Sequence, residues 1–399
     1  MPIPIICLDE TLQHFAERFS QVFSKPQYQH FVTVLLGLMQ CEGNRTLTGL
    51  LRQIAEQPSL AGLSRFLSEA PWEARAVADC WLRHFREEMQ PQVSAVLQQQ
   101  RQGQAKHRGR PKRPVVTGYL IGDDSTIQKR KGKQMEGLGV HHSTTEEKRV
   151  RGHSLVENLY VLLGRRCPLA PQLYRQQVVC EKEGVPFQSK IALMEETIRT
   201  FEPVVGTLTH VLLDSWYSAK CLWRAARERD FLITTGIKSN RWLAVADPSV
   251  PQGWRWQQLS DYTAQLKASD YMQLRWPKGK DTVYVHVVNT RVRSLYRSQV
   301  VIVRRSLDAP LSQARYWASS DLEASPERLL LHIATRLRHR GALWRWQRGT
   351  GLGSLSTDER AGDCALLDVG DARLCLSGGR THAPASTVAT PSHHWAGTP

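Results

Sequence analysis

The stretch "THVLLDSWYSAKCLWRAARERDFLITTG", residues 209–236, decides the fold. Its first apolar run is typical of a buried strand, the middle part has helical spacing, and "FLITTG" begins a second apolar run, so the stretch predicts strand, helix, strand. Asp214 stands at the end of the first run. It could cap a helix that begins near Tyr217, or it could offer its carboxylate to a metal ion. Position alone leaves both interpretations open.

A second pair of acids ends another apolar run. "VVTGYLIGDDST", residues 115–126, closes on Asp123 and Asp124. Acids at the ends of neighbouring strands can converge at one edge of a sheet, and convergent carboxylates suit Mg²⁺, which takes one or two of them plus substrate phosphate oxygens. Two such ions about 4 Å apart can support phosphodiester cleavage. Strand alternation directs only one of the pair Asp123 and Asp124 into such a site.

The segments around these two stretches alternate between strand and helix patterns, which predicts an α/β domain from residue 115 onward. Residues 153–174 are typical of two strands, 190–202 of a helix, and 282–292 and 298–307 of further strands. In "ASPERLLLHIATRL", residues 324–337, Ser325 is the expected N-cap of a helix, Pro326 its first residue, and Glu327 lies in the first turn.

Residues 1–100 predict a compact helical domain, which is compatible with a helix-turn-helix and with DNA binding. "LQHFAERFSQVF" (12–23) and "RAVADCWLRHFREEM" (75–89) repeat apolar residues at helical spacing. Prolines at 26, 58, 71 and 91 are expected to separate the helices.

Residues 101–114, "RQGQAKHRGRPKRP", predict a basic linker with almost no apolar residues. Arg108 and Arg110 flank a glycine in "RGRP", a pattern that can follow the minor groove of A·T-rich DNA. Lys112 and Arg113 extend the positive charge. The alternative is a solvated linker without a DNA contact.

The composition favours a nucleic-acid partner. The net charge is +16 and the pI about 9.7, and neutralising phosphates releases counterions. The sequence contains no apolar run of 18 or more residues and no signal-peptide pattern, so we expect a soluble cytoplasmic protein that does not contact membranes. The eight cysteines include no CxxC pair, which predicts reduced thiols rather than a zinc site or disulfides.

Three blocks of the sequence resemble the DDE superfamily endonucleases, the transposases of bacterial insertion sequences. "GDDSTIQKRKGKQMEGLGVHHS" (122–143) resembles the first catalytic block, and residues 210–243 resemble the second and most specific one. Residues 315–336 resemble the approach to the third. The resemblance runs from about residue 10 to 337 and implies an RNase H-like fold: a mixed sheet with helices on both faces and metal ions at its edge.

The resemblance also implies roles for individual residues. Asp124 matches the first metal-binding acid, with Asp123 as the alternative, and Asp214 matches the second. Mg²⁺ or Mn²⁺ is the implied cofactor. The cations expected to contact DNA phosphates are Lys129, Lys131, Lys133, Lys238 and Arg241, and for each of them the alternative is a solvated surface charge.

The third acid of the family is absent from its expected place. It is a glutamate on a late helix and should follow "HIATR", which ends at Arg336, but the sequence has no acid from Arg328 to Thr357. Codons for "WRWQ" (344–347) permit Gly-Asp-Gly-Lys in a frame displaced by one nucleotide, and the displaced frame can also encode the expected Ile-Glu. We therefore hypothesise a frameshift near residues 336–339 and expect residues 338–399 to be an aberrant, disordered tail.

These observations predict a transposase that cleaves and transfers DNA strands at insertion-sequence ends, located at the bacterial nucleoid, with a homodimer as a possible assembly, but catalytically impaired. The alternative is a non-catalytic DNA-binding remnant or an inhibitor of an intact transposase. The expected domains are 1–100, the linker 101–114, an incomplete catalytic domain 115–337 and the tail.

Overall fold

The computed structural model describes residues 10–40, 46–54, 58–104, 115–129, 135–143, 147–277 and 279–350. Most of the expected linker and most of the expected aberrant tail therefore lie outside the described residues. The helices are α1 Glu10–Glu17, α2 Lys25–Gln40, α3 Leu47–Leu51, α4 Leu60–Ser68, α5 Ala74–Gln104, α6 Gln177–Glu183, α7 Lys190–Thr200, α8 Lys220–Glu228, α9 Leu259–Gln265 and α10 Pro326–Thr350.

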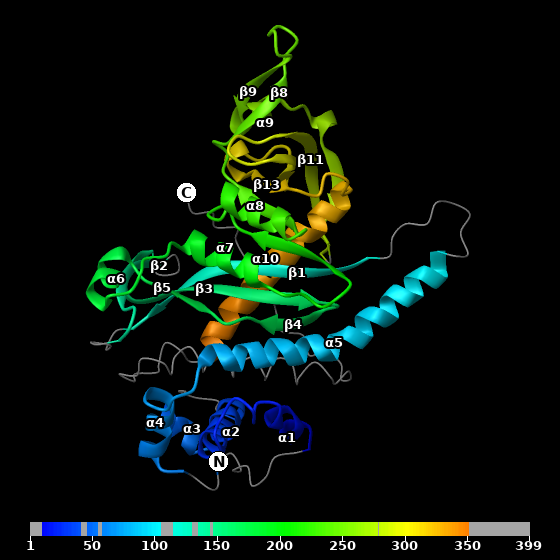
Figure 1. The fold of residues 1–399 in the computed structure, drawn as a ribbon. Helices are drawn as coiled ribbons and strands as arrows, with labels where there is room; N and C mark the ends of the chain where they lie inside the picture. The colour runs from blue at the N-terminus through cyan, green and yellow to red at the C-terminus, as the bar shows by residue number, and fades with distance from the viewer. Residues whose placement is uncertain are drawn as a thin grey trace.

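A large mixed sheet forms the centre of the molecule (Figure 1). Its strand order is β10-β11-β12-β13-β7-β6-β1-β3-β2, and β4 and β5 also pair with β3. The strands β8 and β9 form a separate hairpin. The strands are β1 Val116–Gln128, β2 Gly139–Ser143, β3 Lys148–Leu162, β4 Arg165–Pro168, β5 Gln172–Tyr174, β6 Thr207–Leu213, β7 Leu232–Ile237, β8 Trp242–Ala246, β9 Trp254–Gln258, β10 Met272–Arg275, β11 Thr282–Arg291, β12 Arg297–Arg304 and β13 Arg315–Ser319.

The order β4-β3-β1-β6-β7 is an RNase H-like sheet. The strands β4, β3 and β1 are antiparallel neighbours, whereas β1, β6 and β7 run parallel. The predicted strand–helix–strand unit of residues 209–236 is observed as β6, α8 and β7. The expected α/β fold with an RNase H-like mixed sheet, flanking helices and preceding N-terminal helices is therefore confirmed.

Helices cover the sheet on both faces. On one face, Met194 of α7 packs against Gly122 of β1, where a side chain larger than hydrogen would collide with it. On the other face, α10 crosses behind β1 and β6 (Figure 1). Ser325 caps α10 as predicted, because its hydroxyl accepts the N–H of Arg328 at 3.3 Å. The main chain of α10 remains helical to Thr350, so the expectation that the disordered tail begins at residue 338 was wrong for residues 338–350.

Two buried histidines lie where α10 meets the sheet. The rings of His210 in β6 and His332 in α10 are 4.1 Å apart, and Tyr119 of β1 lies 5.6 Å from His332. Burial lowers the pKa of His332 to about 4, with Arg328 adding to the effect. Burial, His332 and Arg328 likewise place the pKa of His210 well below its usual range. Both rings are therefore neutral at physiological pH.

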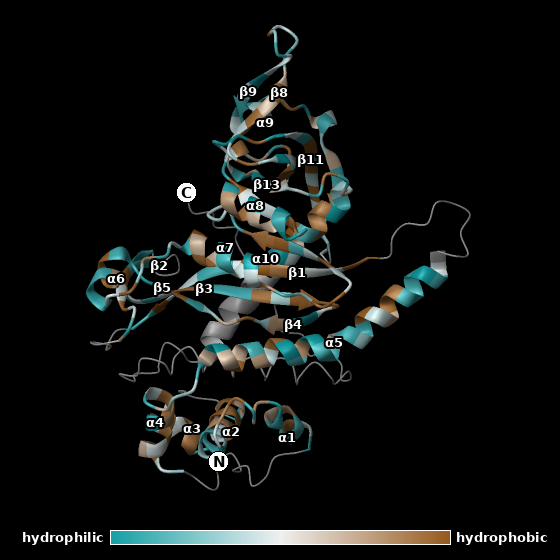
Figure 2. Ribbon diagram, viewed as in Figure 1, coloured by the Kyte–Doolittle hydropathy of each residue, from teal (hydrophilic) through white to brown (hydrophobic). Residues whose placement is uncertain are grey.

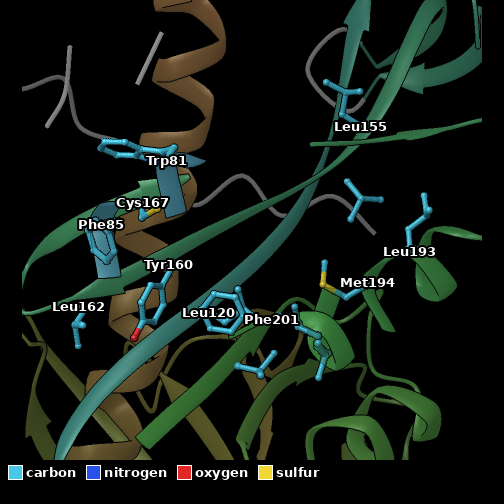
Figure 3. Packing of buried hydrophobic residues seen from close by; sticks show 14 of the residues in the cluster. Trp81, Phe85, Leu120, Leu155, Tyr160, Leu162, Cys167, Leu193, Met194 and Phe201 are labelled. Atoms are coloured by element: carbon cyan, nitrogen blue, oxygen red, sulfur yellow. The ribbon is translucent and has the colours of Figure 1, made fainter. Parts of the chain in front are cut away.

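The N-terminal helices share a core with the sheet through α5. Figure 3 shows Trp81 and Phe85 of α5 beside Tyr160 of β3, and the Phe85 and Tyr160 rings lie 5.8 Å apart. Gly118 of β1 leaves the space that the Tyr160 ring occupies. Along α5, hydrophobic residues recur between hydrophilic ones (Figure 2). The buried ones form an apolar stripe that includes Val77, Trp81, Phe85, Met89 and Val93. This stripe joins α1–α4 to the sheet in one hydrophobic cluster.

The expectation that Pro91 separates two helices was wrong, because α5 runs through it. Proline removes one backbone hydrogen bond from a helix interior. Met89 and Val93, 1% and 0% exposed, are anchored in the core on either side and hold the helix together. The helix α5 also continues through Gln104, so the first four residues of the expected linker 101–114 are helical.

None of the helices within the described ranges is long and apolar enough to cross a membrane. The four cysteines in the described part of the chain, Cys80, Cys167, Cys180 and Cys221, are free thiols.

Candidate active site

The two acids of the first block lie on opposite faces of β1. Asp123 faces α10, where its Oδ2 lies 3.5 Å from Nη2 of Arg336. Asp124 faces α7 and forms an ion pair with Lys190, the first residue of that helix. The pleat of the strand causes this separation, because successive side chains point in opposite directions. Each acid therefore has a cation of the protein beside it.

Asp214 shapes the turn between β6 and α8. Its Oδ1 accepts the backbone N–H of Trp216 at 2.9 Å and of Tyr217 at 3.3 Å. The alternative that Asp214 caps a helix beginning near Tyr217 was wrong, because α8 begins at Lys220 after Ala219 as its N-cap. The turn packs tightly on β7, where the backbone nitrogen of Ser215 lies 2.9 Å from the position that a Cβ on Gly236 would take.

The strand register brings Asp214 beside the first-block acids. Strands β1 and β6 are parallel neighbours with Ile121 opposite Leu212. Continuing that register by two residues sets Asp123 opposite Asp214, the residue that follows β6. Leu212 and Ile121 share one apolar cluster on the α10 face. Asp123, and not Asp124, is therefore the first-block acid that lies on the same face of the sheet as Asp214.

Tyr217 lies on the turn that Asp214 shapes, three residues after that acid. The residue is fully buried, and its hydroxyl oxygen has no hydrogen-bond partner among the residues that the structure describes. Burial raises the pKa of Tyr217 most strongly, and the carboxylates of Asp124, Asp214 and Asp123 raise it further, in that order. All three carboxylates therefore act on the pKa of this one buried side chain.

A fourth acid, Glu157 of β3, faces the same region. It is paired directly with Asp123 across the antiparallel strands, so both side chains lie on the α10 face. Glu157 and Arg336 are each only 3% exposed. Four residues of this region were not predicted from the sequence: Glu157, Lys190, Tyr217 and Arg336. For Glu157 a signal was present, because Glu157 and Asn158 are polar residues that interrupt the apolar run "LVENLYVL" (155–162) of β3.

The carboxylates have the right chemistry for a hard divalent cation, which prefers oxygen ligands. Among the residues that the structure describes, however, no group of three or more His, Cys, Asp and Glu side chains is arranged to hold a metal ion. Asp123 and Asp214, which the strand register sets opposite each other, would give such a cation two carboxylate ligands, and the cation would take its remaining ligands from DNA phosphate oxygens.

The cations predicted to contact DNA have different positions. Lys129 is only 4% exposed, so its ammonium group would reach DNA only if this part of the chain rearranged. It is not the solvated surface charge of the alternative interpretation either. Lys238 and Arg241 line a pocket together with Ser215 and Trp216, the two residues that follow Asp214. The other predicted contacts lie outside the described residues: Arg108, Arg110, Lys112, Arg113, Lys131 and Lys133.

The parallel core β1-β6-β7, its antiparallel partner β3 and the acids at its edge define an RNase H-like protein. The family model of the DDE superfamily endonucleases matches residues 18–260, more than half of the chain. The chain therefore belongs to the DDE superfamily endonucleases. The match includes Asp123, Asp124 and Asp214 and ends before α10. No curated protein matches the chain.

Family membership implies DNA as the substrate and a nuclease activity of the transposase type. Members of this superfamily typically use divalent metal ions.

Proposed function

We propose that the protein is an insertion-sequence transposase whose reaction centre is the edge of β1 and β6. The observation that supports this most is the strand register, which sets Asp123 of β1 opposite Asp214 in the part of the chain that matches the family. Asp214 and one first-block acid, Asp124 or Asp123, would hold Mg²⁺ or Mn²⁺. When bound, such an ion supplies charge stabilisation and an activated oxygen nucleophile for phosphodiester cleavage and strand transfer.

The chain's own residues have distinct tasks in this proposal. Asp214 fixes the turn that follows it through its two backbone hydrogen bonds. Arg336 and Lys190 balance the charge of Asp123 and Asp124 when no divalent ion is present. A divalent ion that bound at Asp123 or Asp124 would therefore compete with these cations for the carboxylates.

The chain as written should bind DNA but join strands poorly. The helix α10 is the late helix of the third block, and the sequence offers no acid between Arg328 and Thr357. Glu327 lies in the first turn of α10. The expected glutamate follows Arg336, so it would lie about 15 Å from Glu327 along the helix axis at 1.5 Å per residue. We infer that a frameshift near residues 336–339 removed this glutamate.

Three further parts of the proposal concern partners and place. The DNA bound would be the ends of the element and a target. The N-terminal helices and the basic segment, residues 101–114, would contribute to DNA binding. The protein would act at the bacterial nucleoid, with a homodimer as a possible assembly. The second candidate function, a DNA-binding remnant or inhibitor of an intact transposase, is favoured by the absence of the third acid.

The test of the site uses the chain with the displaced frame restored. Asp123→Asn, Asp124→Asn and Asp214→Asn variants are compared for Mg²⁺-dependent cleavage of DNA that carries the element's own ends. Asp261→Asn, an exposed acid on α9, is the matched control. We expect cleavage to fall at least a hundredfold for Asp214 and for one of the first-block acids, and to persist in the control. Persistent cleavage in all four variants would contradict the proposed centre.

A further inference from the structure

A pocket of about 410 Å³ opens beside the turn that Asp214 shapes. Three segments distant in the sequence form it: the Ser215–Trp216 turn, the loop from Lys238 to Trp242, and the turn at Arg293 and Ser294. Its volume lies in the range of roughly 300–1,000 Å³ that is typical of small-molecule sites. The pocket is thus large enough for one small ligand, and it lies next to the proposed reaction centre.

The charge of the pocket favours an anion. Lys238, Arg241 and Arg293 line it, and its lining contains no carboxylate. The Arg241 guanidinium is held in place, because its Nη2 donates to the carbonyl oxygen of Ser218 at 2.6 Å. Within the described ranges, neither Lys238 nor Arg293 forms a salt bridge, and both are exposed. A fixed guanidinium with two free cations beside it is suited to a phosphate group.

The aromatic side chains of the pocket favour a flat apolar group beside that phosphate. Trp216 is 62% exposed and Trp242 is 36% exposed, and both line the pocket. Hydrogen bonds fix their main chains: Trp216 N–H donates to Asp214, and the carbonyl of Trp242 accepts the N–H of Arg293 at 2.8 Å. Exposed indole rings on a fixed backbone are the usual stacking platforms for nucleobases.

We propose that this pocket binds one unpaired nucleotide of a DNA strand, with its base stacked on Trp216 or Trp242 and its phosphate held by Lys238, Arg241 and Arg293. The ligand must be unpaired, because the faces of bases inside a duplex are already stacked on their neighbours. Since Trp216 is two residues from Asp214, the bound nucleotide adjoins the position where the strand would be cut. The inference rests on the proposed function, because it takes DNA as the ligand.

The experiment measures binding, so it needs no catalytic activity. The full chain is titrated against two fluorescently labelled duplexes with the same duplex sequence, one blunt and one with a two-nucleotide single-stranded overhang, and the anisotropy gives both Kd values. Trp216→Ala and Trp242→Ala are compared with Trp256→Ala. Trp256 is also 36% exposed but lies on β9 outside the pocket, so it is a matched control.

We expect the chain to prefer the overhang duplex, and Trp216→Ala or Trp242→Ala to reduce that preference at least fivefold, as the loss of one base–aromatic stack of about 1–3 kcal/mol implies. Trp256→Ala should keep the preference. Lys238→Ala and Arg293→Ala should weaken binding of the overhang duplex more than of the blunt one.

Two results would overturn the inference in different ways. Equal Kd values for the two duplexes, unchanged in all three tryptophan variants, would remove the pocket inference and leave the DNA-binding function intact. Absence of binding to both duplexes would contradict the proposed function itself. Thermal melting of each variant checks that a loss of binding is not a loss of folding.

Discussion

Arg336 and Asp123 form a buried contact between the last described helix and the central strand: Nη2 of Arg336 lies 3.5 Å from Oδ2 of Asp123, and the two side chains are 3% and 12% exposed. A buried charge that loses its partner is costly, whereas replacing both partners by apolar groups is often neutral. The contact connects α10 to the proposed reaction centre, so a substitution that breaks it should affect both the stability of the fold and the reaction at that centre.

Removing one side of this contact should destabilise the protein. We expect Asp123→Ala to lower the free energy of unfolding by about 3 kcal/mol, because it leaves the Arg336 guanidinium buried with less compensation. The double variant Asp123→Leu with Arg336→Met should recover most of that loss. Urea unfolding followed by tryptophan fluorescence measures both. A loss below about 1 kcal/mol for Asp123→Ala would show that other groups balance Arg336.

Asp214 should have a structural role separable from a catalytic one. Asp214→Ala removes the acceptor of two backbone N–H groups, and we expect it to cost about 1 kcal/mol of stability. Asp214→Asn keeps an acceptor oxygen and should cost less than half of that, although it removes the charge that a metal ion needs. Chemical denaturation of the two variants checks this. An equal cost for both would mean that the negative charge, not the hydrogen bonds, stabilises the turn.

The buried histidines under α10 predict that acid destabilises the protein. The unfolded chain binds protons at His332 near its ordinary pKa of 6.5, whereas the folded chain binds them only near a pKa of about 4. Stability should therefore fall as the pH drops from about 6.5 to 4. Because the pKa of His332 falls from 6.5 to about 4, and a difference of one in pKa corresponds to roughly 1.4 kcal/mol, His332 contributes about 3.5 kcal/mol, and His210 adds a loss in the same direction.

The measurement is the free energy of unfolding as a function of pH for the wild type and for His332→Phe. The variant should show a smaller fall below pH 6.5. His142→Gln, an exposed histidine on β2, should follow the wild type. A pH dependence that His332→Phe leaves unchanged would assign the acid sensitivity to other groups.

DNA binding should depend steeply on salt, with the basic segment contributing. Replacing Arg108, Arg110, Lys112 and Arg113 by serine should flatten the slope of log K against log[salt] by about 0.9 for each phosphate that the segment no longer neutralises. A control with four scattered exposed cations replaced should change the slope less; these are Arg75, Lys182, Arg224 and Lys267. Equal slopes for the two variants would mean that the charge of the whole protein, and not this segment, neutralises the phosphates.

Much of the fold could be predicted from local patterns. The unit β6–α8–β7 was predicted because its apolar runs are uninterrupted, and the start of α10 because Ser325, Pro326 and Glu327 give independent signals for one helix boundary. The passage of α5 through Pro91 could not be predicted. The core packing of Met89 and Val93, which overrides the proline, involves residues distant in the sequence.

The site could be predicted less completely for a geometric reason. The sequence locates Asp123, Asp124 and Asp214 at strand ends, but it does not say which helix covers which face of β1. The cations Lys190 and Arg336 reach these acids from α7 and α10, across 66 and 213 positions of the chain (190 minus 124 and 336 minus 123). Glu157 faces Asp123 only because β3 pairs with β1 in one particular register.

The most direct test of the central claim compares the chain as written with a chain in which the displaced frame is restored near residues 336–339. Both are assayed for Mg²⁺-dependent joining of element-end DNA to a target, and both are first shown to bind that DNA. We expect comparable binding, strand joining by the restored chain, and at least a hundredfold less joining by the chain as written. Equal joining by the two chains would contradict the claim that this α10 lacks an essential acid.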